Sequence, residues 1–262
     1  MSNLDFGVRT NRKLILAYHE NDTTPFPLPP THSPNPALTK LLIINGNGGE
    51  FYFPWITTNI VSFDSNEEII APSLSNFNII GEGGAGGLLN GEAVYCGGWP
   101  EEGEDCSNEC FKLGDETPFF KMKLGRCFAS YVVMNDRLFM IGGDNDRNED
   151  NARTTEFVSI DQEAFDVGPA LPIDHTGGCA TLLSAKKVLI TGGRDYLHRT
   201  FIYDFENPSL DWVVGPTMIV GRQHHGCATF NAITIVTGGN DHDGSVEILS
   251  PSNPDFWRFC KF

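Results

Sequence analysis

The chain has little positive charge. Its 262 residues contain 18 Lys and Arg against 34 Asp and Glu, which gives a formal net charge of −16. Binding a nucleic-acid backbone needs clustered Lys and Arg, so the composition argues against a nucleic-acid partner. The same deficit argues against binding to an anionic membrane surface. A protein or peptide partner with basic or mixed charge is the better electrostatic match.

Several signatures of targeting and catalysis are also missing. No run is long and apolar enough to span a bilayer, and residues 1–5 lack the basic and then apolar pattern of a signal peptide. The sequence has no Gly-x-Ser-x-Gly elbow, no His-Glu-x-x-His and no phosphate loop ending in Gly-Lys-Ser/Thr. We therefore expect a cytoplasmic protein without catalytic residues, cofactor or metal, and a secreted one if a targeting segment precedes this sequence.

The seven cysteines include no Cys-x-x-Cys pair, which makes a zinc site improbable. Cys127, Cys179 and Cys227 recur at one position of an internal repeat, so we predict that they are small buried residues. Cys96 and Cys110 could face each other on neighbouring strands and form a disulfide in an oxidising compartment. The sequence leaves that question open.

Glycine is abundant, with 28 residues, and much of it belongs to the repeat. A short β-branched or aromatic run ending in Gly-Gly occurs in residues 41–49, 93–98, 138–143, 188–193 and 233–239. The spacing is roughly 45–50 residues, which is typical of propeller repeats. Each clear unit also has one run before the double glycine and two after it. We therefore predict four short strands per unit, named a to d, with the double glycine closing strand b.

The matching residues resemble the kelch repeat. They are the double glycines that begin at 97, 142, 192 and 238, Tyr203 with Asp204, Trp212, Trp257, and Arg126 and Arg222 in the turn that enters strand a. The resemblance implies a β-propeller of four-stranded blades. Glycine permits close backbone approach where the inner strands crowd, and the large aromatic residue of strand d fills the space between blades. Several units lack the Tyr or the Trp.

We predict an all-β fold in which residues 1–262 form a single kelch-type β-propeller. Residues 1–30 are a partial sixth blade or an N-terminal edge, and residues 31–79 are a degenerate repeat whose strand a begins at 31–34. The clearer repeats are 80–124, 125–174, 175–221 and 222–262. The glycine-rich segment 83–87 looks like a nucleotide loop but leads into a strand, not a helix, so we assign it to the turn and strand a of its repeat.

Strand alternation places the b–c loops and the d–a turns on one face of such a fold. Three of the four clear b–c loops are acidic, while the turns carry Arg and His, so we expect an acidic rim around a few basic residues. The candidate binding residues are Arg126, Asp144, Asp146, Arg147, Arg194, Tyr196, Arg222, His224 and His242. Segment 144–151 resembles a calcium loop but lacks its glycine and the spacing to its terminal Glu.

The kelch resemblance implies a non-catalytic protein-interaction module with a substrate-receptor or scaffold role. The alternative is a metal-dependent propeller enzyme of the oxidase or specifier type. That alternative needs metal ligands that converge near the centre, and the candidates are His175, His224, His225 and Cys127.

Overall fold

The computed structural model describes residues 83–99, 105–112, 115, 117–144, 152–160, 166–230, 232–239 and 245–260, together with the backbone of five N-terminal strands. The described chain is all-β, with almost no helix beyond the short η2 (Pro208–Leu210). No helix in the described residues is both long and apolar enough to cross a membrane.

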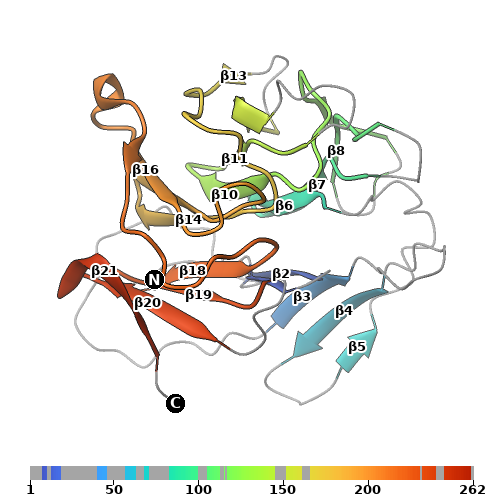
Figure 1. Ribbon diagram of the computed structural model, residues 1–262. Helices are drawn as coiled ribbons and strands as arrows, with labels where there is room; N and C mark the ends of the chain where they lie inside the picture. Colours follow the sequence, from blue (N-terminus) through green and yellow to red (C-terminus); the bar gives the residue numbers. More distant parts are fainter. Residues whose placement is uncertain are drawn as a thin grey trace.

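The strands form five antiparallel sheets that follow one another along the chain (Figure 1). Sheet 1 contains β1 (Val8–Thr10), β2 (Lys13–Tyr18), β3 (Lys40–Asn45), β4 (Thr57–Ser62) and β5 (Glu68–Ile70). Sheet 2 contains β6 (Ala85–Leu89), β7 (Glu92–Cys96), β8 (Glu109–Lys112) and β9 (Phe120–Lys121). Sheet 3 contains β10 (Ser130–Met134), β11 (Arg137–Ile141), β12 (Thr155–Val158) and β13 (Asp166–Val167).

Sheets 4 and 5 repeat the same plan. Sheet 4 contains β14 (Cys179–Ser184), β15 (Lys187–Thr191), β16 (Thr200–Asp204) and β17 (Val213–Val214). Sheet 5 contains β18 (Gly226–Phe230), β19 (Ile233–Thr237), β20 (Val246–Ser250) and β21 (Asn253–Phe259). In sheets 2 to 5 each strand pairs with the next in the sequence. The predicted four-stranded unit is therefore confirmed for these sheets, and segment 83–87 forms the turn and the start of β6, as predicted.

The first strands of the sheets lie side by side. β6 contacts β10, β10 contacts β14, and β14 contacts β18. β18 also contacts β1, and β2 contacts β6, so the contacts between inner strands run through all five sheets and return to the first (Figure 1). This arrangement is consistent with a β-propeller.

The N-terminal strands differ from the expectation of a partial sixth blade. β2 pairs with β3 along its whole length, and β1 pairs with β2, so both strands belong to sheet 1. β2 thus occupies the place of strand a, which we had expected to begin at residues 31–34. Those residues lie outside the described part of the chain. The sequence signal failed because an isolated apolar run does not indicate which neighbouring run it pairs with.

The hydrophobic core lies between neighbouring sheets. Strand β11 shows why, because its side chains alternate between two clusters. Leu138 and Met140 pack in a cluster with residues of sheet 2, whereas Phe139 and Ile141 pack in a cluster with residues of sheet 4. Trp257 of β21 is buried in a third cluster that joins sheets 4 and 5. Its predicted role as a filler between sheets is confirmed.

The double glycine allows adjacent sheets to approach closely. Gly142 has φ +64, and a Cβ there would collide with the carbonyl oxygen of His175 in the next sheet. Gly143 has φ +97, and its N–H donates to that same oxygen at 2.9 Å. The corresponding bonds run from Gly98 to Arg126 and from Gly193 to Arg222. A side chain would prevent this contact, which confirms the predicted need for glycine.

Three disulfides cross-link the described residues. Cys96–Cys110 joins β7 to β8, so the open question about this pair is answered. Cys179–Cys227 joins the first strands of sheets 4 and 5, and Cys106–Cys127 joins sheet 2 to the turn that enters sheet 3. The predicted burial of Cys127, Cys179 and Cys227 is confirmed. Their repeated position indicated burial but did not indicate that each forms a disulfide.

Candidate functional site

Four equivalent turn residues form a chain of backbone hydrogen bonds from sheet to sheet. They are Gly83, Phe128, Gly177 and His224, each two residues before the first strand of its sheet. Phe128 N–H donates to Gly83 O at 2.7 Å, Gly177 N–H to Phe128 O at 2.8 Å, and His224 N–H to Gly177 O at 2.6 Å. All four have positive φ. We call this set the turn chain.

The turn chain alternates small and large side chains. A Cβ on Gly83 would meet the ring of Phe128, and a Cβ on Gly177 would meet the ring of His224. Each ring therefore lies over the glycine of the preceding sheet. The two rings also meet edge to face, with centroids 5.3 Å apart and planes at 75°. Both residues are half-buried, so this aromatic pair is partly accessible to solvent.

Phe128 is the most unusual of these residues. Its φ is +53°, a conformation that a bulky L-residue rarely adopts. Such a conformation costs of order 1–3 kcal/mol and persists only where surrounding contacts hold it, commonly at a functional site. His224 has the same φ of +53°. Two strained residues whose rings touch at one end of the sheets make this the strongest candidate site in the described chain.

Charged residues of the b–c loops lie at the same end. Asp144 exchanges two backbone hydrogen bonds with Cys127, next to Phe128. Its carboxylate also accepts a hydrogen bond from Arg194 Nη1 at 2.7 Å, which links the b–c loops of sheets 3 and 4. The side chain of Arg194 is exposed, and its backbone N–H donates to Thr176 O, next to Gly177. The predicted placement of the b–c loop starts beside the d–a turns is confirmed for these residues.

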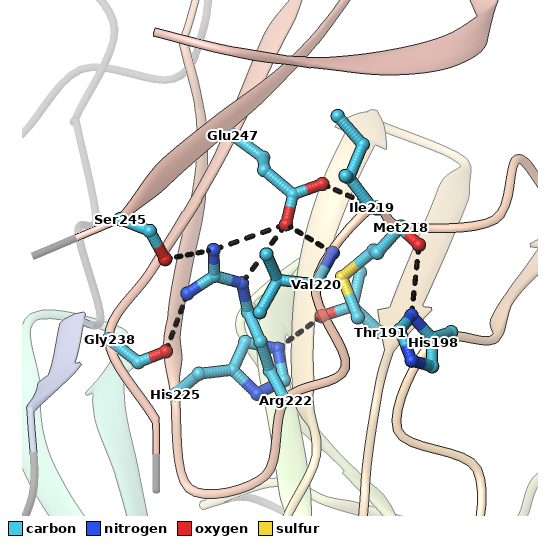
Figure 2. Close-up of polar contacts among 10 residues, drawn as sticks. All are labelled: Thr191, His198, Met218, Ile219, Val220, Arg222, His225, Gly238, Ser245 and Glu247. Carbon is cyan, nitrogen blue, oxygen red and sulfur yellow. Dashed lines mark hydrogen bonds and ion pairs between the residues drawn. The ribbon is translucent and has the colours of Figure 1, made fainter. Parts of the chain in front are cut away.

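Arg222 is not available to a partner, contrary to the expectation. It is fully buried, and Nη1 donates to Gly238 O at 2.6 Å (Figure 2). Nη2 donates to Ser245 Oγ at 2.8 Å and to Glu247 Oε1 at 3.1 Å. Glu247 also accepts the backbone N–H groups of residues 219 and 220, so its charge is well satisfied. Arg222 therefore ties the turn, the end of strand b and strand c of sheet 5 together.

Arg126 holds sheet 3 in the same way and is likewise buried. It donates to Gly142 O at 2.6 Å and to Thr154 Oγ1 at 2.8 Å, and it lies 3.6 Å from Glu156 Oε2. Burial raises the pKa of Glu156, while the N–H of Lys123 and the charge of Arg126 oppose that rise. Burial also lowers the pKa of Arg126. We call the Arg–Glu arrangement in sheets 3 and 5 the Arg–Glu clasp.

Sheet 4 has other residues at both positions of the clasp. His175 stands at the Arg position, four residues before the first strand, and Phe201 stands at the Glu position. Pro172 stands where Lys123 and Ile219 supply an N–H to the Glu, so sheet 4 lacks the N–H at that position. In sheet 2 the corresponding sequence positions are Gly81 and Phe111. In sheets 2 to 5, Arg and Glu thus occur together or not at all, as expected for a buried ion pair.

The four candidate metal ligands are engaged in other contacts. His175 Nε2 lies 2.8 Å from Ser130 Oγ, and His225 Nε2 lies 2.8 Å from Thr191 Oγ1 (Figure 2). Cys127 is in a disulfide, and His224 packs on Phe128. Among the described residues, no group of three His, Cys, Asp or Glu side chains could hold a metal ion.

The remaining predicted residues divide into two groups. Tyr196 is half-buried against the core between sheets 3 and 4, with the guanidinium of Arg199 5.3 Å from its ring centroid. Asp146, Arg147 and His242 lie outside the described residues. The sequence analysis missed Phe128, although the spacing that singled out His224 places Phe128 at the same position of its repeat.

Comparison with protein-family models finds no match for this chain, and comparison with curated proteins finds none either. The resemblance to kelch repeats therefore rests on the repeat residues themselves.

Proposed function

We propose that the five sheets are the blades of a kelch-type β-propeller whose turn chain forms the centre of a protein-binding face. The observation that carries this proposal is the Phe128–His224 pair, in which two left-handed, half-buried residues from different sheets present their rings together. Aromatic side chains that keep one face accessible are typical anchors of protein interfaces. The module has a scaffold or receptor role and no catalytic one.

Charge supports a basic or mixed-charge partner. The chain carries a net charge of −16, and Asp105 and Asp195 are exposed in b–c loop segments of sheets 2 and 4. An acidic rim speeds the encounter with a basic peptide, while a central aromatic pair supplies the apolar contact and can hold a cation over its rings. We expect binding to weaken as ionic strength rises, because exposed charges are screened.

The three disulfides also bear on the compartment. Disulfides persist in oxidising compartments and are rare in the cytosol. They favour the secreted alternative over the cytoplasmic expectation, and we propose that the protein works outside the cytosol.

The binding proposal can be tested with random peptides displayed on phage. Selection on the immobilised protein should enrich peptides that contain Lys or Arg. Phe128→Asn should reduce their capture at least tenfold, because Asn tolerates positive φ but removes the ring. Val214→Asn is the matched control, since Val214 is exposed on the outer strand β17. Equal capture by wild type and Phe128→Asn would rule out the aromatic pair as the anchor.

A second variant separates charge from the aromatic contact. Reversal of Asp146, Glu149 and Asp150 to Lys should slow association and weaken its salt dependence. Unchanged kinetics in this variant would limit the binding determinant to the rings.

A further inference from the structure

The three disulfides differ in how accessible their cysteines are. Cys96, Cys110, Cys127, Cys179 and Cys227 are between 0% and 8% exposed, whereas Cys106 is half-buried. A disulfide opens when a thiolate reaches one of its sulfurs, so access decides which bond reacts first. Cys106–Cys127 is therefore the bond that a reductant in solution reaches most readily, and the other two lie inside the core.

The accessible disulfide also lies at the proposed binding face. Cys127 immediately precedes Phe128, and Cys106 belongs to the b–c loop of sheet 2. The loop is also joined to this turn by two backbone hydrogen bonds: Arg126 N–H donates to Ser107 O at 3.0 Å, and Gly98 N–H donates to Arg126 O at 2.8 Å. The covalent link closes a chain segment with a sequence separation of 21 residues.

We propose that Cys106–Cys127 is a reducible latch that holds the turn with Phe128 in its binding conformation. A regulatory role for this disulfide rests on the proposed binding function of the turn chain. Opening the latch leaves Cys96–Cys110 within sheet 2 and Cys179–Cys227 between sheets 4 and 5 intact, so the effect is local. A dithiol in the surroundings thus reduces partner binding without unfolding the protein.

The chemistry is thiol–disulfide exchange with a dithiol reductant. Its thiolate attacks the sulfur of Cys106, the Cys106–Cys127 bond breaks, and Cys127 leaves as a thiolate. The second thiol of the reductant then displaces Cys106 from the mixed disulfide. The protein gains two electrons and two protons as two cysteine thiols, and the reductant becomes a disulfide.

Stepwise reduction of the full chain by dithiothreitol tests the order of opening. Free thiols are alkylated at each step and located by peptide mass mapping, with Cys260 as the internal reference because it is free from the start. Cys106 and Cys127 should become alkylated at a dithiothreitol concentration at least about tenfold below that needed for the other pairs. Simultaneous opening, or earlier opening of Cys179–Cys227, would overturn the proposal.

Hydrogen exchange tests the mechanical consequence without any partner. The Cys106→Ser/Cys127→Ser variant should exchange the amides of Arg126 and Phe128 about tenfold faster or more, while the Leu189 amide in β15 keeps its protection. The Cys179→Ser/Cys227→Ser variant is the control, and it should accelerate exchange in sheets 4 and 5 instead. Unchanged exchange at Arg126 and Phe128 in the latch variant would also overturn the proposal.

Peptide capture separates the latch from the proposed function. If captured peptides bind the oxidised protein and are lost from the latch variant, both proposals stand. Equal capture by both forms overturns the latch as a regulator. If the oxidised protein captures no peptide, the binding proposal fails, while alkylation and exchange still decide whether the latch exists.

Discussion

The Arg–Glu clasp of sheet 5 can be tested against the replacement that sheet 4 already contains. Glu247→Phe alone leaves the buried Arg222 guanidinium without its counter-charge and leaves two backbone N–H groups without an acceptor. Removing one partner of a buried ion pair costs about 3–5 kcal/mol. Arg222→His alone should cost a similar amount, because it leaves a buried carboxylate and removes the bonds to Gly238 and Ser245.

The double variant Arg222→His/Glu247→Phe reproduces the His175 and Phe201 combination of sheet 4. It removes both charges together, so it should cost less than the sum of the single changes by about 2–3 kcal/mol. Urea unfolding followed by Trp fluorescence gives the free energies, provided that the m-values of the four proteins agree. Asp166→Asn breaks the partly exposed Arg137–Asp166 pair as a control and should cost less than about 1 kcal/mol.

Additivity of the two single changes to within about 0.5 kcal/mol would refute the reasoning. It would mean that the joint occurrence of Arg and Glu in sheets 3 and 5 does not reflect their interaction. A loss of less than 1 kcal/mol for Glu247→Phe would show that water replaces the carboxylate at no great cost.

Three further predictions concern stability. Gly142→Ala should cost more than Gly91→Ala by at least about 1 kcal/mol in urea unfolding, because both glycines have positive φ but only Gly142 approaches a backbone oxygen. Cys179→Ala/Cys227→Ala should lower the unfolding free energy by about 4 kcal/mol, the loop entropy of a separation of 48 residues, whereas unchanged stability would exclude a stabilising cross-link. Burial lowers the pKa of His175 to about 4, below its ordinary 6.5, so the folded protein favours the neutral imidazole. The contribution of this neutral imidazole to the free energy of unfolding is complete above pH 6.5 and is lost as pH falls towards 4. His175→Gln should flatten this acid loss by about 3 kcal/mol in unfolding titrations, and parallel curves for both proteins would contradict a neutral buried imidazole.

Most of the fold could be predicted from the repeat, because each repeat marks its strands with residues that are neighbours in the sequence. A strand b that ends in Gly-Gly, such as Leu138 to Gly143, fixes both the strand and its end, and the structure confirms it in sheets 2 to 5. Sheet 1 was harder to predict, because the run at Lys13–Tyr18 carries no double glycine. Its pairing with Lys40–Asn45 is a contact between distant segments that strand propensity does not specify.

The site was predicted less well because burial was not visible in the pattern. Arg126 and Arg222 looked like surface charges in turns, since Arg is rarely buried. Their partners Glu156 and Glu247 lie 30 and 25 residues further on in strand c, and the two pairs can be recognised only when the repeats are aligned. The cysteine partners Cys106 and Cys127 belong to different repeats, so repeat analysis treated them separately.

The clasp and the strained turns occur in the same sheets, and this suggests why both exist. Arg126 and Arg222 each lie two residues before an aromatic turn residue, Phe128 and His224 respectively. In sheets 2 and 4 the turn residue is glycine, which adopts positive φ without strain, and there the clasp is absent. A turn that carries a large ring at positive φ needs more contacts to hold it, and the buried Arg supplies them by binding strands b and c. The clasp variants of sheet 5 should therefore weaken peptide capture through His224, although neither Arg222 nor Glu247 reaches the surface.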